Sequence, residues 1–458
     1  MRRENRQIID GVIWKQLLIF FFPILLGTAF QQLYNIADAI IVGHTLGTVA
    51  LAAVGGPTTY LINILLNFFV GVCSGATVVI AQYYGAEDSE RTSEAVHTAM
   101  LLSIVAGIGF SIVGVALAKT ALSWMGTPEE VMPHAVSYLR IYYAGLIFSF
   151  IYNMGSSVLR AKGDSKRPFY LLVLATIVNI IGNLVFIIKF HWGVASVAWA
   201  TTLSQFVSSI GVCYLLAHEK DEFHLSFCRL WPFQVHILRN ILHIGVPTGM
   251  QSQLFSLSNI IIQTTINSFG VQTIAAWGTF ARIDMSLWMT LNSLGVAVST
   301  FAGQNFGARK YDRVTKSIVV AIWYSIITCI VCGFSFVYWG PQLFALFTSD
   351  AEVVAIGMKI AWMLAPWYIL YFPVTTLAGG MRGTGNSIIP MAVTALGICV
   401  FRSLWMWCVV PFYCTMTTVF VSYPVSWALT TILLSLYHWK SHWLEKSIVR
   451  AGHRPASE

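Results

Sequence analysis

The chain has 458 residues, of which 57% are hydrophobic and 10% are charged, and its mean hydropathy is +0.71. Because roughly a quarter of the residues in soluble domains are charged, this composition excludes a soluble globular protein and indicates an integral membrane protein. The net charge of +8 does not indicate nucleic-acid binding, since the sequence has neither a Gly-rich phosphate loop nor a basic-aromatic RNA-binding pattern.

A helix needs about 20 apolar residues to cross the hydrocarbon core of a bilayer. Twelve such runs follow one another, so the sequence predicts an all-α integral membrane protein with twelve transmembrane helices. The first six runs are 15–43, 51–83, 94–118, 136–158, 168–190 and 194–217. The second six are 237–267, 273–302, 314–338, 353–378, 388–411 and 416–437. Pro23 is expected to bend the first helix, because proline removes a backbone hydrogen bond.

Lysine and arginine are distributed unequally between the two ends of these helices. The connections at one end, with both chain termini, contain 21 of them, and the connections at the other end contain two. Since cytoplasmic loops carry the excess of positive charge, both termini are predicted to lie in the cytoplasm of a cell-membrane protein. The predicted parts are a cytoplasmic N-terminal segment (1–14), an N-terminal lobe (15–217), a cytoplasmic linker (218–236), a C-terminal lobe (237–437) and a cytoplasmic tail (438–458).

The two halves of the sequence repeat each other at a shift of 222 residues. "AQYYGAE" (81–87) aligns with "GQNFGAR" (303–309), and "RAKGDSKRP" (160–168) aligns with "RGTGNSIIP" (382–390). A shift across six helices, an even number, gives two parallel repeats with the same orientation in the membrane. Transporters use such repeats around a central site, although duplication alone does not require transport.

These paired motifs, together with "FPILLGTAFQQLYNIADAIIVGHTLGTVALAAVG" near the start, resemble the multidrug and toxic compound extrusion (MATE) family along nearly the whole chain. The resemblance implies two six-helix lobes, V-shaped about a cavity that opens alternately to the two sides of the membrane. It also implies export of amphiphilic organic cations in exchange for H+ or Na+. We further expect a monomer whose partners are small organic cations or amphiphiles and the lipid bilayer, and not nucleic acid, and that needs no cofactor besides the coupling ion.

Only two acidic residues, Asp38 and Asp284, fall well inside predicted spans. A buried Asp costs about 2.5–3.5 kcal/mol on insertion scales, so its presence needs a reason. Loss of water disfavours the charged carboxylate, so the group must take up a proton or hold a cation. We therefore predict that Asp38 is the coupling residue; the alternative is a hydrogen bond that only ties helices together.

Polar residues on three predicted helices can surround Asp38 in the outer half of the N-terminal lobe. Asn35 lies on the same helix, and Gln31, Asn35 and Asp38 follow the i, i+4, i+7 spacing of one helix face. The other predicted members of this cation-coupling site are Asn179, Asn183, Thr201 and Thr202. Their hard oxygen ligands suit H+ or Na+ and not a transition metal.

The resemblance refines this prediction. Asp38 matches the acid of the family's first helix, and Asn183 stands where the DinF-like branch often has a second acid. The NorM-like branch has a Glu in the seventh helix, where this sequence has only Gln251 and Gln253. The chain thus resembles the DinF-like branch with a single acid, which favours H+, while Na+ bound by Asp38, Asn179 and Asn183 remains the alternative.

A substrate cavity is expected to contain polar and aromatic side chains, because cation–π contacts favour organic cations. The candidate residues are Gln31, Tyr34, Gln251, Gln253, Trp277, Asp284 and Trp288. Asp284 has Arg282 two residues away, and a role in locking helices together is as well supported as a role in transport. Arg140 and Arg402 are close enough to the ends of spans to extend toward the membrane surface.

Two other functions compete with multidrug export. A lipid-linked oligosaccharide flippase of the same superfamily would need a cluster of cations in the cavity for a pyrophosphate, for which Arg282 and cations at the ends of spans are the candidates. A membrane-embedded enzyme would need paired acids, a histidine cluster or a nucleophile with its base inside the spans. The histidines mostly border loops without metal-ligand spacing, which disfavours the enzyme.

Overall fold

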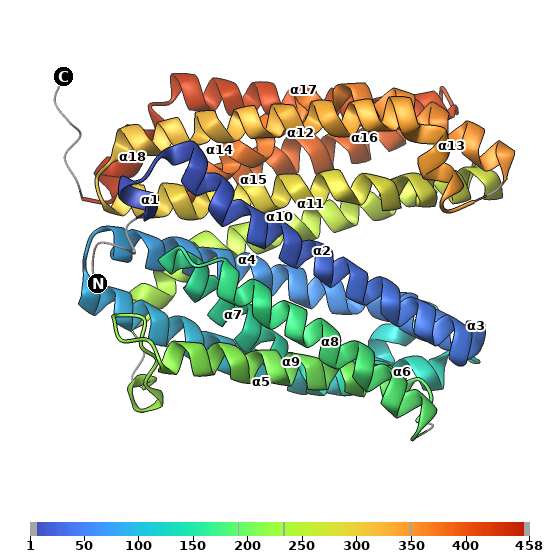
Figure 1. Ribbon diagram of the computed structural model, residues 1–458. Helices are drawn as coiled ribbons and strands as arrows, with labels where there is room; N and C mark the ends of the chain where they lie inside the picture. Colours follow the sequence, from blue (N-terminus) through green and yellow to red (C-terminus); the bar gives the residue numbers. More distant parts are fainter. Residues whose placement is uncertain (1–6, 191, 232–233, 349, 453–458) are drawn as a thin grey trace. The chain divides into compact units, whose positions relative to one another are not determined.

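The computed structural model of the chain describes residues 7–190, 192–231, 234–348 and 350–452 (Figure 1). The regular structure in these ranges is helical throughout. The predicted N-terminal segment and C-terminal tail extend beyond them, into residues 1–6 and 453–458.

The first half of the chain forms the first nine helices and one 3₁₀ turn. They are α1 (Gln7–Asp10), α2 (Ile13–Thr45), α3 (Gly47–Gly55), α4 (Pro57–Gly85), α5 (Ser89–Trp124), α6 (Met132–Ala144), α7 (Leu146–Lys162), α8 (Lys166–Ile188), α9 (Ala195–Ala217) and η2 (Phe227–Arg229). The second half repeats this series with more breaks. It contains α10 (Val235–Asn267), α11 (Val271–Gly307), α12 (Tyr311–Ala345), α13 (Ala351–Leu364), the 3₁₀ segment η3 (Ala365–Leu370), α14 (Phe372–Gly383), α15 (Ile388–Thr394), the π-helix η4 (Ala395–Val400), α16 (Phe401–Cys408), α17 (Met416–Lys440) and α18 (Trp443–Arg450).

The helices coincide with the predicted spans. In the described part of the chain, nine helical segments are long and apolar enough to cross a membrane, and the pair α6 and α7, bent by 46°, makes a tenth. The more polar helices α10 and α11, with 33 and 37 residues, coincide with the two remaining predicted runs. The prediction of an all-α membrane protein is therefore confirmed.

Two compact units divide the helices. Of the described residues, unit 1 contains Ile19–Gly249, and unit 2 contains residues 7–18 and those from Met250 to 452. The divisions fall inside α2 and α10, the first helices of the two sequence repeats, so each of these helices contributes to both units. Helix α2 runs without a break through Pro23, which leaves the carbonyl of Ile19 without its helical donor; bending at Pro23 stays a prediction.

The first pair of repeated motifs folds in the same way in both units. Helix α4 ends at Gly85 and α11 ends at Gly307. Two residues later the chain takes a left-handed conformation in both copies, at Glu87 (φ 61°) and Arg309 (φ 57°). The backbone hydrogen bonds that close the two turns also match, so the repeat is present in local structure as well as in sequence.

The second pair of motifs gives another matched turn. Gly163 (φ 101°) follows α7 and Gly385 (φ 88°) follows α14, and each donates its N–H to the carbonyl three residues earlier, at Arg160 and Arg382. A left-handed glycine after the last helical residue is a common way to end a helix. The turn favours glycine at this position, which accounts for the Gly that both motif copies have three residues after the Arg.

Close helix packing in unit 1 depends on small residues. Helices α4 and α10 cross where Gly71 and Gly75 face Gly245 and Gly249, and a Cβ built on Gly71 would overlap the backbone of Gly249. Both helices thus carry glycines four residues apart, the arrangement that lets membrane helices approach backbone to backbone.

Candidate functional site

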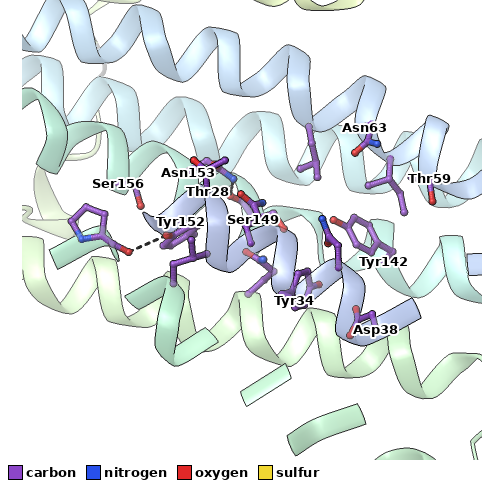
Figure 2. A pocket seen from close by; sticks show the side chains of 18 of the residues that line it. Thr28, Tyr34, Asp38, Thr59, Asn63, Tyr142, Ser149, Tyr152, Asn153 and Ser156 are labelled. Atoms are coloured by element: carbon purple, nitrogen blue, oxygen red, sulfur yellow. Dashed lines mark hydrogen bonds between the residues drawn. The ribbon is translucent and has the colours of Figure 1, made fainter. Parts of the chain in front are cut away.

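A cavity of about 470 Å³ lies inside unit 1 (Figure 2). Its walls come from α2, α3, α4, α6, α7, α8 and α9, and every residue that lines it belongs to unit 1. Along α2 it extends from Pro23 to Ala39, a rise of about 24 Å at 1.5 Å per residue. Figure 2 shows Tyr152 and Ser156 toward one end and Asp38 toward the other.

The predicted stripe on α2 faces this cavity. Gln31, Tyr34, Asn35 and Asp38 all line it, which is what residues three and four apart on one helix should do. Asp38 is 8% exposed, although its neighbours Gln31 and Asn35 are exposed. The carboxylate therefore lies at the boundary between the cavity and the interior of the helix bundle.

Behind Asp38, a chain of hydrogen bonds connects α2 with α8 and α9. Asn183 donates its Nδ2 to Asp38 Oδ1 (2.5 Å) and to Asn179 Oδ1 (3.1 Å). Thr201 Oγ1 accepts from Asn179 Nδ2 (3.4 Å) and from the hydroxyl of Tyr34 (3.1 Å). We refer to Asp38, Asn183, Asn179, Thr201 and Tyr34 as the Asp38 network.

The packing of α8 on α9 positions this network. Gly182 lies against Ala200, where an added Cβ would come within 3.2 Å of the alanine Cβ. The small side chains allow the two helices to approach closely, so that Asn179 and Asn183, one turn apart on α8, reach Thr201 on α9. Both asparagines are fully buried.

The charge of Asp38 is not compensated by the protein. Its hydrogen-bond donor is a neutral amide, and no Lys or Arg of the described residues forms an ion pair with it. A buried carboxylate without an opposite charge is strongly disfavoured, so it must bind a proton or another cation. Asn183 Oδ1 is buried without a hydrogen-bond partner and is a free acceptor beside the acid. These oxygen atoms suit a small hard cation.

The structure brings together four of the six residues predicted for this site: Asp38, Asn179, Asn183 and Thr201. Asn35 lines the cavity beside Asp38 but takes no part in the Asp38 network. Thr202 points to a different place, because its side chain packs against Gly145 at the bend between α6 and α7. Gln31, Tyr34 and Pro23 line the cavity.

The other predicted cavity residues, Gln251, Gln253, Trp277, Asp284 and Trp288, belong to unit 2 and do not line this cavity. Asp284 is 8% exposed and accepts hydrogen bonds from Trp288 Nε1 (2.6 Å) and from the hydroxyl of Tyr368 (2.5 Å). Arg282 is exposed, so these two neutral donors are the partners that the structure gives the acid. The bond to Tyr368 joins α11 to η3, which favours the helix-locking interpretation of Asp284.

Arg402 corrects a prediction. It does not extend to the membrane surface but is 4% exposed, donating Nε to Ser426 Oγ (2.7 Å) and stacking on Tyr423 at 4.0 Å. Trp277 packs on the same aromatic group, with ring centroids 5.8 Å from Tyr423. Aromatic faces stabilise a buried guanidinium, which the sequence pattern alone did not reveal.

Sequence reasoning missed most of the residues that line the unit 1 cavity, among them two tyrosines and an arginine. Tyr138 and Tyr142 contribute from α6, where "YLRIYYA" gives no more than a helical aromatic pattern. Arg160 contributes from the last turn of α7, although its place in "RAKGDSKRP" predicted a cytoplasmic connection.

Comparison with known proteins identifies the same two halves of the chain. The MatE family profile matches the chain twice, over residues 23–185 and 247–407. A protein of Bacillus subtilis (strain 168), "Probable multidrug resistance protein YoeA", is 29% identical over 456 residues, which is 96% of each chain. A protein of Shewanella oneidensis named "FAD transporter" is 23% identical over 383 residues, covering 81% of this chain and 80% of the relative. The crystal structure of MATE in the straight conformation superposes with a TM-score of 0.89 at 23% identity, over 96% of this chain and 98% of that chain.

Proposed function

The chain belongs to the MatE family of multi-pass membrane transporters, and on that basis we propose that it exports amphiphilic, mainly cationic organic compounds in exchange for protons. The name of the Bacillus subtilis relative, a probable multidrug resistance protein, supports the efflux of foreign compounds. Membership of this family makes the protein a transporter and not an enzyme.

The observation that carries the proposal is the uncompensated carboxylate of Asp38 at the wall of a cavity. An acid in this position is neutral when protonated and negative when the proton leaves. A cationic substrate in the cavity is attracted only to the negative form, so substrate and proton compete for one residue. Tyr34, Tyr138 and Tyr142 line the same cavity, and cation–π contacts contribute about 0.5–2 kcal/mol each.

We propose H+ and not Na+ as the coupling ion. A proton needs only the carboxylate, whereas a metal cation needs several oxygen ligands at once. The Asp38 network contains one charged group, because Asn183 and Asn179 are neutral, and Asn183 turns an N–H toward the acid. The seventh helix has Gln251 and Gln253 and lacks the Glu of the NorM-like branch, which supports the placement in the DinF-like branch.

One proton per cycle can drive the export. Exchange of one proton for one monovalent cation moves no net charge, so the pH gradient supplies the driving force, about 1.4 kcal/mol or tenfold accumulation per pH unit. The direction of export rests on the proposal that both termini lie in the cytoplasm. We further propose that the monomer is the working unit.

Removing sodium tests this choice of ion. In proteoliposomes at fixed pH, replacing Na+ with choline should leave the uptake of a fluorescent organic cation unchanged. The proposed coupling ion is a proton, which binds to the Asp38 carboxylate without Na+. An imposed pH gradient with an acidic vesicle interior should increase the initial rate, measured by fluorescence, because a proton leaves the vesicle for each cation that enters. Loss of uptake in choline would assign Na+ to the Asp38 site instead.

A further inference from the structure

The unit 1 cavity contains a cation that the proposed mechanism does not use. Arg160, in the last turn of α7, lines the cavity. Its guanidinium donates from Nη2 to Ser157 Oγ at 2.7 Å, while its Nε is buried without a hydrogen-bond partner. A donor in this state is costly unless something else accepts from it.

The charge of Arg160 is also uncompensated. Arginine stays protonated in proteins, and no carboxylate of the described residues forms an ion pair with this side chain. A buried charge without a partner is strongly unfavourable. An anion bound in the cavity would therefore stabilise the guanidinium.

Two serines line the same cavity. Ser156, one turn before Arg160, is 1% exposed, and its Oγ lies near the Tyr152 hydroxyl. Ser165 is 5% exposed and also lines the cavity. Arg160 and the two serines offer one charged and two neutral donors to an anionic group.

This group of donors and Asp38 lie toward opposite ends of the cavity. Figure 2 shows Ser156 and Tyr152 toward the end away from Asp38, with Asn153, Thr28 and Ser149 between them. Arg160 follows Ser156 by four residues on the same helix, so it lies on the same face. The cavity thus has a negative end and a positive end.

The repeat provides a comparison. Arg382 occupies the corresponding position at the end of α14, and its Nε is also buried without a partner. Arg382, however, does not line the unit 1 cavity. A purely structural role at the helix end would make the two arginines equivalent, whereas binding of a ligand in the unit 1 cavity would involve Arg160 and not Arg382.

We propose that Arg160, with Ser156 and Ser165, is an anion subsite that binds the carboxylate of zwitterionic amphiphiles. A guanidinium binds a carboxylate through two parallel N–H donors, and the free Nε can be one of them. The proposal rests on the proposed function, since it assigns the second end of the same cavity. It extends the substrates from organic cations to compounds that carry a cationic and an anionic group.

A pair of dyes with one skeleton tests the subsite. Rhodamine B is a cation with a free carboxylate, and its methyl ester lacks only the negative charge. We expect the purified wild-type protein to bind rhodamine B about tenfold more tightly than the ester, measured by fluorescence anisotropy, because charged hydrogen bonds are the stronger ones. Arg160→Gln should remove this preference by weakening only the binding of the free acid, and Arg382→Gln should retain it.

Several results would overturn the subsite: equal binding of the two dyes by wild type, no binding of rhodamine B, or an equal loss for both dyes in Arg160→Gln. If that variant does not fold, Ser156→Ala should still weaken the free acid more than the ester, and an equal effect on both would reject the proposal. A different measurement tests the proton-coupling proposal, so its failure can be distinguished from failure of the anion subsite. Proton-driven transport of the ester should persist in Arg160→Gln and stop in Asp38→Asn.

Discussion

Asp38→Asn is expected to reduce proton-driven uptake of an organic cation to the level of empty liposomes, a loss of at least about tenfold. Asparagine has nearly the same shape and can still accept the hydrogen bond from Asn183. It cannot gain or lose a proton near neutral pH, so substrate and proton no longer compete. The measurement is fluorescent cation uptake into proteoliposomes under an imposed pH gradient.

Asp284→Asn is the matched control, since it neutralises the other buried acid. Asparagine can still accept from Tyr368 or Trp288, so transport should continue while the midpoint of thermal unfolding falls. Wild-type activity in Asp38→Asn would reject Asp38 as the coupling residue. Equal losses in both variants would indicate a general loss of buried polar structure.

The second large effect is expected on stability. Gly71→Val should lower the free energy of unfolding by about 1–3 kcal/mol or more, because its Cβ would occupy the space of the Gly249 backbone. Both sides of this contact are backbone, so no side chain can move aside. Helices α4 and α10 must then separate, and the midpoint of thermal unfolding in detergent should fall.

Gly109→Val provides the control for this substitution. Gly109 also lies inside a long helix, α5, but nothing lies within 4 Å of a Cβ built there. Both variants therefore place a valine inside a helix, with the same intrinsic effect on helix stability. Only Gly71→Val disturbs a contact with another helix. Similar unfolding midpoints for both would contradict the close crossing of α4 and α10.

The spans, the repeat and the family were accessible from the sequence, because they rest on composition and on spacing. Apolar runs of about 20 residues and an offset of 222 do not depend on side-chain packing. Asp38 was accessible for a similar reason: a lone acid in an apolar helix is conspicuous. Its partners Asn179 and Asn183 followed from their spacing of four residues on one helix.

The rest depends on how the helices pack. The motif "RAKGD" predicts a helix end and a cytoplasmic loop at Arg160, and only the structure shows that the last turn of α7 faces a cavity. Arg402 lies near the end of a predicted span, but aromatic rings from another helix surround its guanidinium. Thr202 adjoins Thr201 in sequence, and successive residues of a helix point in different directions.

Proton release on substrate binding tests the central claim most directly. When an organic cation is added to the purified protein in weakly buffered detergent solution at fixed pH, wild type should release up to one proton per bound cation. Asp38→Asn should release none, while Asp284→Asn should behave as wild type. Cation binding to wild type without proton release, or undiminished release from Asp38→Asn, would contradict competition between proton and substrate at Asp38.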